Sequence, residues 1–199
     1  MEAILKEGLA QLGLDTGSIP ALTEFSRRLL EKNQVMNLTA ITEPADVARL
    51  HLLDCACLLT AADFRGKQVV DVGTGAGFPG MPLRLLEPDF DLTLLDSLGK
   101  RVEWLTELCR ELDLPDVVLL KGRAEELSRR KTHREQYDVA VSRALAAMPM
   151  LAELCLQIDA AAQARGRAAA ISVNWPQAVL QVRFVDAAQP VETESLEDI

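Results

Sequence analysis

Long apolar runs are missing from this 199-residue chain, and no stretch approaches the roughly 20 residues that a membrane-spanning helix needs. The first residues, MEAILKEGLAQLGL, lack a basic region followed by an apolar core, so no secretory signal is visible. The four cysteines form no CxxC pair and are too few for a disulfide scaffold, which indicates reduced thiols packed as small hydrophobic side chains. We therefore expect a cytoplasmic protein with neither a membrane nor a metal partner.

Basic residues are in deficit, with 21 lysines and arginines against 30 acidic residues and a net charge of −9. Taken alone, this balance argues against a nucleic-acid partner. The charge is uneven, however, because residues 121–134 hold six basic and two acidic side chains, whereas residues 186–199 are acidic only. That basic run fits either a local binding surface or an ordinary solvated helix face.

The composition, with 49% hydrophobic and 26% charged residues, is that of one globular domain. Residues 1–62 show helical apolar spacing without a strand pattern, and Ser18–Pro20 and Thr42–Pro44 are helix-start signals. From residue 68, short strand-like runs, the first of them β-branched, alternate with helical stretches, which predicts a parallel sheet of order 3-2-1-4 with right-handed crossovers. The predicted strands are 68–72, 91–96, 117–120 and 137–141, and the predicted helices between them are 79–86, 100–112 and 125–131.

The chain is less regular beyond residue 157. Seven of the fourteen residues 157–170 are alanine, and only residues 179–185 have the pattern of a further strand. We therefore divide the single domain into an N-terminal helical extension (1–62), an α/β core (63–156) and a divergent C-terminal segment with an acidic tail (157–199).

The segment VVDVGTGAGFPGMPL, residues 69–83, predicts a strand, a tight glycine turn and the start of a helix. Glycines at 73, 75 and 77 let the backbone approach a ligand closely. Asp71 ends the strand, and its carboxylate is expected to face the same crevice. Asp96 ends the next strand, 21 residues after Gly75, where a carboxylate can accept both hydroxyls of a ribose.

Two cofactors fit this turn. Gly75, Gly77 and Gly80 match the GxGxxG dinucleotide pattern, which predicts an NAD-linked oxidoreductase. That register starts only after Gly73 and contains Pro79. An acid two residues before the first glycine is instead typical of S-adenosylmethionine-dependent methyltransferases, where it suits the positive charge of the cofactor. The sequence favours the methyl donor.

Several segments, taken in order, resemble one family, the bacterial 16S ribosomal RNA guanine-N7 methyltransferases, also called small-subunit methyltransferase G or glucose-inhibited division protein B. They are LLEKNQVMNLTAIT (29–42), HLLD (51–54), the glycine segment, LLDSLGKRVEWL (94–105), KGRAEEL (121–127) and DVAVSRALA (138–146). The resemblance covers residues 1 to about 156 and implies an α/β, Rossmann-like class I methyltransferase sheet with an N-terminal helical extension. The implied reaction moves a methyl group from S-adenosyl-L-methionine to N7 of guanosine 527, in the 530 loop of the small-subunit RNA.

The resemblance also implies the site residues. Carried over position by position, the family's cofactor contacts are Gly73, Phe78, Ala124, Glu125 and Arg143, with Gly75 in the same loop and Asp96 on the ribose side of the cleft. Other roles stay open for Phe78 as a core aromatic, Glu125 as a first-turn helix acid and Arg143 as a surface ion pair. The candidates for contacts with RNA phosphates are Lys100, Arg101, Arg123, Arg129, Arg130 and Lys131.

No catalytic acid or base is expected, because guanine N7 carries an in-plane lone pair and loses no proton before attack. Catalysis should come from positioning N7 against the methyl group. His51 and Asp54, three residues apart on one helical face, are predicted to form a structural hydrogen-bonded pair. Since the family's continuation is not recognisable beyond residue 156, a catalytically degraded methyltransferase-like protein is an open alternative.

Overall fold

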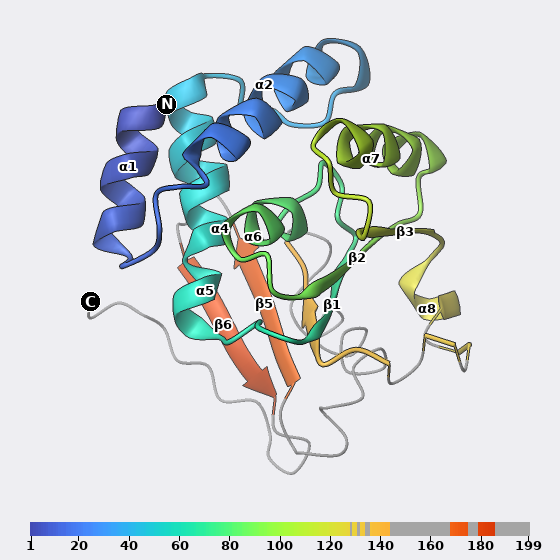
Figure 1. Cartoon of the computed structure of the whole chain (residues 1–199). Coiled ribbons are helices and arrows are strands. Elements are labelled where there is room, and N and C mark those ends of the chain that lie inside the picture. The colour runs from blue at the N-terminus through green and yellow to red at the C-terminus, as the bar shows by residue number, and fades with distance from the viewer. Residues whose placement is uncertain (128, 131, 134–135, 144–167, 175–178, 186–199) are drawn as a thin grey trace.

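The computed structural model describes residues 1–127, 129–130, 132–133, 136–143, 168–174 and 179–185 (Figure 1). A helical N-terminal part precedes alternating strands and helices. The N-terminal part contains α1 (Glu2–Gln11), α2 (Ile19–Met36), α3 (Pro44–Val47), the π-helical segment η1 (Ala48–Leu53), α4 (Asp54–Ala56) and α5 (Leu58–Ala61). The remainder contains β1 (Gln68–Val72), α6 (Gly80–Leu86), β2 (Asp91–Asp96), α7 (Gly99–Glu111), β3 (Val118–Lys121), α8 (Ala124–Leu127), β4 (Val139–Val141), β5 (Ala168–Asn174) and β6 (Val179–Val185).

Both predicted helix starts in the N-terminal part are confirmed. Ser18 is the N-cap of α2, and Pro20 lies in its first turn, where a missing N–H breaks no intrahelical bond. Pro44 is the first residue of α3. The second helix is not continuous, because the chain passes into the π-helical η1 before α4. The apolar spacing of residues 44–58 gave no sign of that change.

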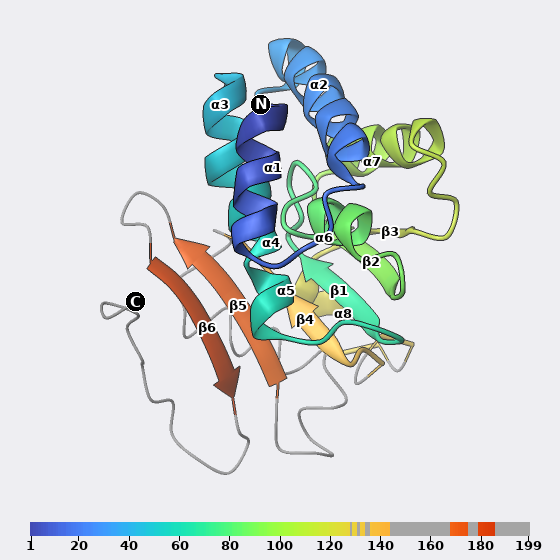
Figure 2. The ribbon, with the colours of Figure 1, turned by 60° about the vertical axis from the view of Figure 1, so that its left-hand side comes forward.

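The described strands form one sheet of order β3-β2-β1-β4-β5-β6, in which β6 runs antiparallel to β5 (Figure 2). The predicted order and parallel pairing of the first four strands are confirmed. The element ends differ slightly from the sequence prediction. β4 begins at Val139 rather than at residue 137, and α8 spans Ala124–Leu127 within and just before the predicted helix.

The described residues beyond 157 form two strands, although the sequence predicts only one. Residues 179–185 form β6 as predicted, but β5 at residues 168–174 is missed. β5 begins inside the alanine-rich stretch, and alanine is depleted in strands, so local propensity argued against it. Pairing with β4 on one side and β6 on the other determines its conformation.

The two faces of the sheet carry separate hydrophobic clusters. Alternation along β1 places Val69 in the cluster that also contains buried residues of α1, α2, α6 and α7. Val70 and Val72 belong to the second cluster, together with Leu127 of α8. The N-terminal helices therefore share a core with the sheet.

Two of the four cysteines are buried thiols of the first cluster, as predicted. Burial raises the pKa of Cys55 to about 12 and that of Cys109 to about 11, so neither forms a reactive thiolate near neutral pH. Cys57 is half-buried, and Cys155 lies outside the described residues.

Candidate functional site

The glycine turn follows β1 and lies against the end of β2. The backbone N–H groups of Gly73 and Thr74 both donate to the Leu95 carbonyl, at 2.8 and 3.0 Å. Gly73, Gly75 and Gly77 have φ angles of 71°, 59° and 94°, which L residues with a Cβ rarely adopt. The sequence prediction of a tight turn that needs glycine is therefore confirmed at all three positions.

The glycines of the GxGxxG register, Gly75, Gly77 and Gly80, lie in two different environments. A Cβ on Gly77 would lie 2.8 Å from Met81 Cγ, and one on Gly80 would lie 2.7 Å from Leu94 Cδ2. Both positions therefore face the core between the turn and α6. A Cβ on Gly75 would meet only the Gly73 carbonyl oxygen, at 3.9 Å, so this position faces open space. The GxGxxG register is thus explained at its last two glycines by packing.

Asp71 holds the turn together from inside. Its Oδ2 accepts hydrogen bonds from Thr74 Oγ1 at 2.7 Å and from the Gly80 N–H at 2.9 Å. The side chain is fully buried, so the expectation that its carboxylate faces the ligand crevice is wrong. The physical reason is strand alternation, which places Asp71 on the same face as Val69, beneath the start of α6.

Burial raises the pKa of Asp71 to about 7, although the bonds from Thr74 and Gly80 favour the charged form. Because this folded-state pKa lies above the ordinary value of 3.8, the folded protein holds the extra proton between about pH 4 and 7. The resulting stability is present at pH 4 and is lost as the pH rises through 7.

Asp71→Asn should remove this pH dependence while keeping an oxygen for Thr74 and Gly80. From pH 4 to pH 8, the unfolding free energy of the variant should rise relative to the parent by on the order of 2–4 kcal/mol. Urea unfolding at several pH values measures the difference. His51, whose lowered pKa also affects stability here, is common to both proteins and cancels. Parallel pH curves for the two proteins would show that Asp71 does not titrate in this window.

Asp96, at the end of β2, braces the same turn from the other side. Its Oδ2 accepts from the Gly75 N–H at 2.9 Å, and its Oδ1 accepts from the Leu98 N–H at 2.8 Å. Arg101 Nη1 lies 3.5 Å from Oδ2. The carboxylate is thus fixed at the carboxyl edge of the sheet, where ligands bind in open α/β folds.

A pocket of about 230 Å³ opens beside the turn. Four residues expected at the cofactor line it, namely Gly73, Gly75, Phe78 and Arg143. Arg101, expected at RNA phosphates, also lines it. The full lining is Leu38, Thr39, His51, Gly73, Thr74, Gly75, Ala76, Phe78, Arg101 and Arg143.

Sequence reasoning missed the contribution of the helical extension to this pocket. Thr39 and His51 line it, although they lie 34 and 22 residues before Gly73. Both occur in segments that carry the family resemblance, LLEKNQVMNLTAIT and HLLD. Their place in these segments was the only indication in the sequence that they belong to the site. Their place at the pocket follows from tertiary packing of the extension against the turn.

His51 and Asp54 do not bond to each other, so that prediction is wrong. His51 Nε2 lies 2.8 Å from Thr39 Oγ1, and the Asp54 carboxylate lies 3.6 Å from Arg143 Nη1. Burial, with a smaller contribution from the Arg143 charge, lowers the pKa of His51 to about 4, so the imidazole is neutral at physiological pH.

Ala124 and Glu125 form the first turn of α8, after β3, and lie outside the 230 Å³ pocket. The end of β3 is nevertheless next to Asp96, because the Gly122 N–H donates to the Asp96 carbonyl at 3.1 Å. Glu125 lies 3.8 Å from Arg123 in an exposed pair.

The described basic candidates lie in two segments, the start of α7 and the stretch around α8. Lys100 and Arg101 are in the first turn of α7, and Arg129 and Arg130 are exposed residues just after α8. Lys131 lies outside the described residues.

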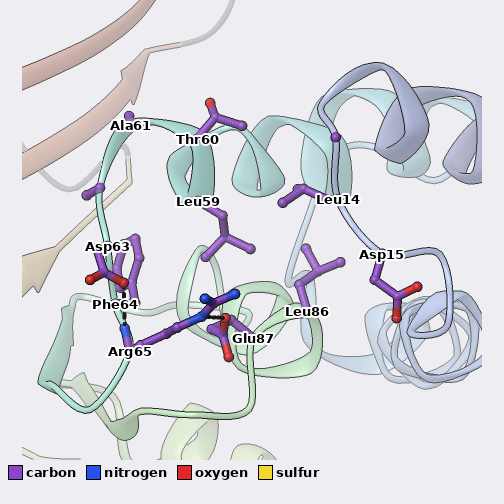
Figure 3. Close-up of a pocket in the computed structure, with 12 residues that line it drawn as sticks. Leu14, Asp15, Leu59, Thr60, Ala61, Asp63, Phe64, Arg65, Leu86 and Glu87 are labelled. Atoms are coloured by element: carbon purple, nitrogen blue, oxygen red, sulfur yellow. Dashed lines mark hydrogen bonds and ion pairs between the residues drawn. The ribbon is translucent and has the colours of Figure 1, made fainter.

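A larger hollow, of about 520 Å³, lies at the opposite edge of the sheet (Figure 3). Its walls come from the turn between α1 and α2, from α5 and the segment that leads into β1, and from the end of α6, so it adjoins the amino end of β1. Arg65 bonds to Glu87 at 2.8 Å within it. None of the sequence-predicted site residues lines this hollow, and we assign the functional site to the pocket at the glycine turn.

The described part of the chain offers little for other classes of site. None of its helices combines the length and the apolar character that crossing a membrane requires. No group of three or more His, Cys, Asp or Glu side chains in these residues is placed to hold a metal ion.

Comparison with known proteins is consistent across sequence and fold. The family model described as "GidB: rRNA small subunit methyltransferase G" matches residues 18–187, which include β5 and β6. A ribosomal RNA small subunit methyltransferase G from Alkaliphilus metalliredigens is 49% identical over 156 residues, covering 77% of this chain and 65% of that protein. The protein of the same name from Alkaliphilus oremlandii is 47% identical over 159 residues, covering 78% and 66%. The chain thus spans about two thirds of the length of these relatives.

Solved structures share the fold at low sequence identity. A SAM-dependent methyltransferase from Aquifex aeolicus aligns with a TM-score of 0.51 at 17% identity, covering 75% of this chain and 72% of that one. A Plasmodium falciparum protein described as a protein-L-isoaspartate O-methyltransferase, in complex with S-adenosyl-L-homocysteine, aligns with a TM-score of 0.55 at 12% identity. That alignment covers 100% of this chain and 94% of the other. The predicted Rossmann-like methyltransferase fold is confirmed.

Proposed function

Because this chain belongs to the GidB family of rRNA small subunit methyltransferases G, we propose that it transfers a methyl group from S-adenosyl-L-methionine to N7 of a guanosine in the 530 loop of 16S ribosomal RNA. The observation that carries the proposal is the pocket at the carboxyl end of β1. Gly73, Phe78 and Arg143, which the family resemblance implies, line it together with Gly75 of the same glycine turn.

The residues present fit the cofactor. Open space over Gly75 admits a ligand against the backbone, and the Arg143 guanidinium suits the carboxylate of a methionine portion. Asp96 has lone pairs left to accept ribose hydroxyls in addition to its two backbone bonds. We assign the adenine side to the backbone of Ala124 and to Glu125, which follow β3 beside Asp96. When bound, the cofactor supplies an electrophilic methyl group.

The protein's part in the reaction is to position the guanine base against the methyl group. Guanine N7 attacks through its own lone pair, so no residue has to remove a proton. The neutral imidazole of His51 agrees with that, because a pKa of about 4 makes it a poor base near neutrality. Rate enhancement then comes from holding N7 close to the methyl group after the base has been unstacked from the RNA.

Two measurements test the proposal against its alternatives. Calorimetric titration should show binding of S-adenosylhomocysteine and none of NADH, whereas an NAD-linked oxidoreductase would give the reverse. Transfer of labelled methyl groups to undermethylated small subunits separates an active enzyme from a degraded methyltransferase-like chain that only binds the cofactor.

The RNA-binding surface yields a further prediction. We propose that Lys100, Arg101, Arg123, Arg129, Arg130 and Lys131 contact RNA phosphates. Replacing Arg129, Arg130 and Lys131 with glutamine should lower the slope of log activity against log salt by up to about 3 units, since each phosphate contact releases a counterion.

A matched control for this triple variant replaces three exposed basic residues that are not among the six candidates, Lys6, Arg65 and Arg110, with glutamine. The control changes net charge equally and should keep the parental slope. Affinity for S-adenosylhomocysteine should be unchanged in both variants. Equal slopes for the parent and both variants would leave the basic run as a solvated surface.

A further inference from the structure

The segment His51–Asp54 reaches the pocket through two separate contacts. It spans the end of η1 and the start of α4, in the helical extension. The Leu50 carbonyl, inside η1, accepts a hydrogen bond from Arg143 Nη1 at 3.4 Å. A π-helical turn shifts the backbone bonding by one residue and recurs at functional sites. Here it lets one carbonyl of the extension meet a side chain from the edge of the sheet.

Asp54 supplies the charge partner of Arg143. Its Oδ2 lies 3.6 Å from Arg143 Nη1, and the two side chains are only 24% and 13% exposed. The Arg143 guanidinium also lies over the Phe78 ring, at 4.4 Å from its centroid. A mostly buried cation without a carboxylate nearby would be costly. Asp54 therefore sets where the guanidinium rests before any ligand arrives.

His51 fixes the position of the Phe78 ring. Its ring stacks on Phe78, with centroids 4.5 Å apart and an interplanar angle of 29°. Thr39 Oγ1 contacts the imidazole at Nε2. The Asn33 side chain in turn holds the Thr39 backbone: its Oδ1 accepts from the Thr39 N–H at 2.8 Å, and its Nδ2 donates to the Thr39 carbonyl at 2.9 Å. Phe78 is 4% exposed. The ring directly after the glycine turn is thus clamped by the extension.

We propose that His51 and Asp54 are positioning residues of the methyl-transfer pocket, His51 acting through Phe78 and Asp54 acting through Arg143. The inference rests on the proposed function and adds to it a role for the helical extension. Arg143 keeps further N–H donors for an acidic group of the cofactor after one is committed to Asp54 and Leu50. A guanidinium held in place beforehand loses less rotational freedom when it binds that group.

The test uses the full chain and the variant Asp54→Asn, which keeps the size of the side chain and removes its charge. Its affinity for S-adenosylhomocysteine should fall about tenfold, because the Arg143 guanidinium is no longer held in place before it binds the ligand. In steady-state methyl transfer, KM for S-adenosylmethionine should rise more than kcat falls. Asp54→Glu, which restores the charge, should recover part of the affinity and carries the test if Asp54→Asn does not fold.

The matched control is Asp46→Asn. Asp46 pairs with Arg49 at 4.0 Å in the same helical extension, but both side chains are more than half exposed and neither lines the pocket. This variant should bind S-adenosylhomocysteine and transfer methyl groups as the parent does.

A second comparison asks whether Asp54 acts through Arg143. Combined with Arg143→Gln, Asp54→Asn should cause no further loss of affinity, because the guanidinium it positions is gone. His51→Gln, which loses the stacked ring, should weaken binding in the presence of an intact Arg143.

The failures are distinguishable. A parent chain that binds S-adenosylhomocysteine and transfers methyl groups, with Asp54→Asn indistinguishable from Asp46→Asn, would overturn this inference alone. Additive losses in the double variant would do the same. A parent chain that neither binds nor transfers would overturn the proposed function and the inference with it.

Discussion

Gly73→Val should weaken binding of S-adenosylhomocysteine about 100-fold while the protein still folds. Gly73 lines the pocket and has a φ of 71°, so a branched side chain there both strains the turn and fills the space where a ligand would meet the backbone. A steric block of about 3 kcal/mol, the upper end of what an overpacked site costs, corresponds to about a 100-fold loss of affinity. Calorimetric titration measures it directly.

The control for Gly73→Val is Gly66→Val. Gly66 has nearly the same conformation, with a φ of 65°, and a Cβ there would meet nothing within 4 Å. This variant carries the same backbone penalty but leaves the pocket untouched. It should bind S-adenosylhomocysteine as the parent does. Unchanged affinity in a folded Gly73→Val protein would remove the glycine turn from the cofactor site.

Asp96→Ala should cost both cofactor affinity and stability. The carboxylate holds the Gly75 and Leu98 N–H groups, and its 4% exposure means that water replaces it poorly. If it also accepts ribose hydroxyls, as proposed, binding should weaken by about 1.5–3 kcal/mol, as for other hydrogen bonds to charged groups. Urea unfolding and calorimetric titration separate the two effects.

Asp91→Ala is the matched control, because Asp91 is the exposed first residue of the same strand. It should leave affinity unchanged. If Asp96→Ala lowers stability but binds S-adenosylhomocysteine like the parent, the carboxylate only braces the turn and the ribose assignment is wrong.

Local patterns were sufficient for the first four strands and for the glycine turn. Short apolar runs bounded by turns located β1 and β2 to the residue. β5 could not be predicted from its sequence, because its alanines have no local preference for a strand. Its conformation comes from pairing with β4 and β6. The burial of Asp71, by contrast, could have been anticipated from alternation with Val69.

The candidate site was predictable only where its residues share one stretch of chain or a family motif. Gly73, Gly75 and Phe78 come from a single segment, and Arg143 was implied by resemblance. The partners of His51 and Asp54 could not be inferred from their spacing. A spacing of three residues on a helix suggested that His51 and Asp54 pair with each other. Instead, η1 and the packing of the extension direct His51 toward Phe78 and Asp54 toward Arg143.

The most direct measurement is methyl transfer by this chain to small ribosomal subunits that lack the modification. Purified chain, labelled S-adenosylmethionine and subunits are incubated, the 16S RNA is digested, and the labelled nucleoside is identified and mapped. We expect one N7-methylguanosine per subunit, located in the 530 loop, with much less label at the same cofactor concentration when Gly73→Val replaces the parent. Label at another atom or another loop, or no label from a parent chain that binds S-adenosylhomocysteine, would contradict the proposed reaction.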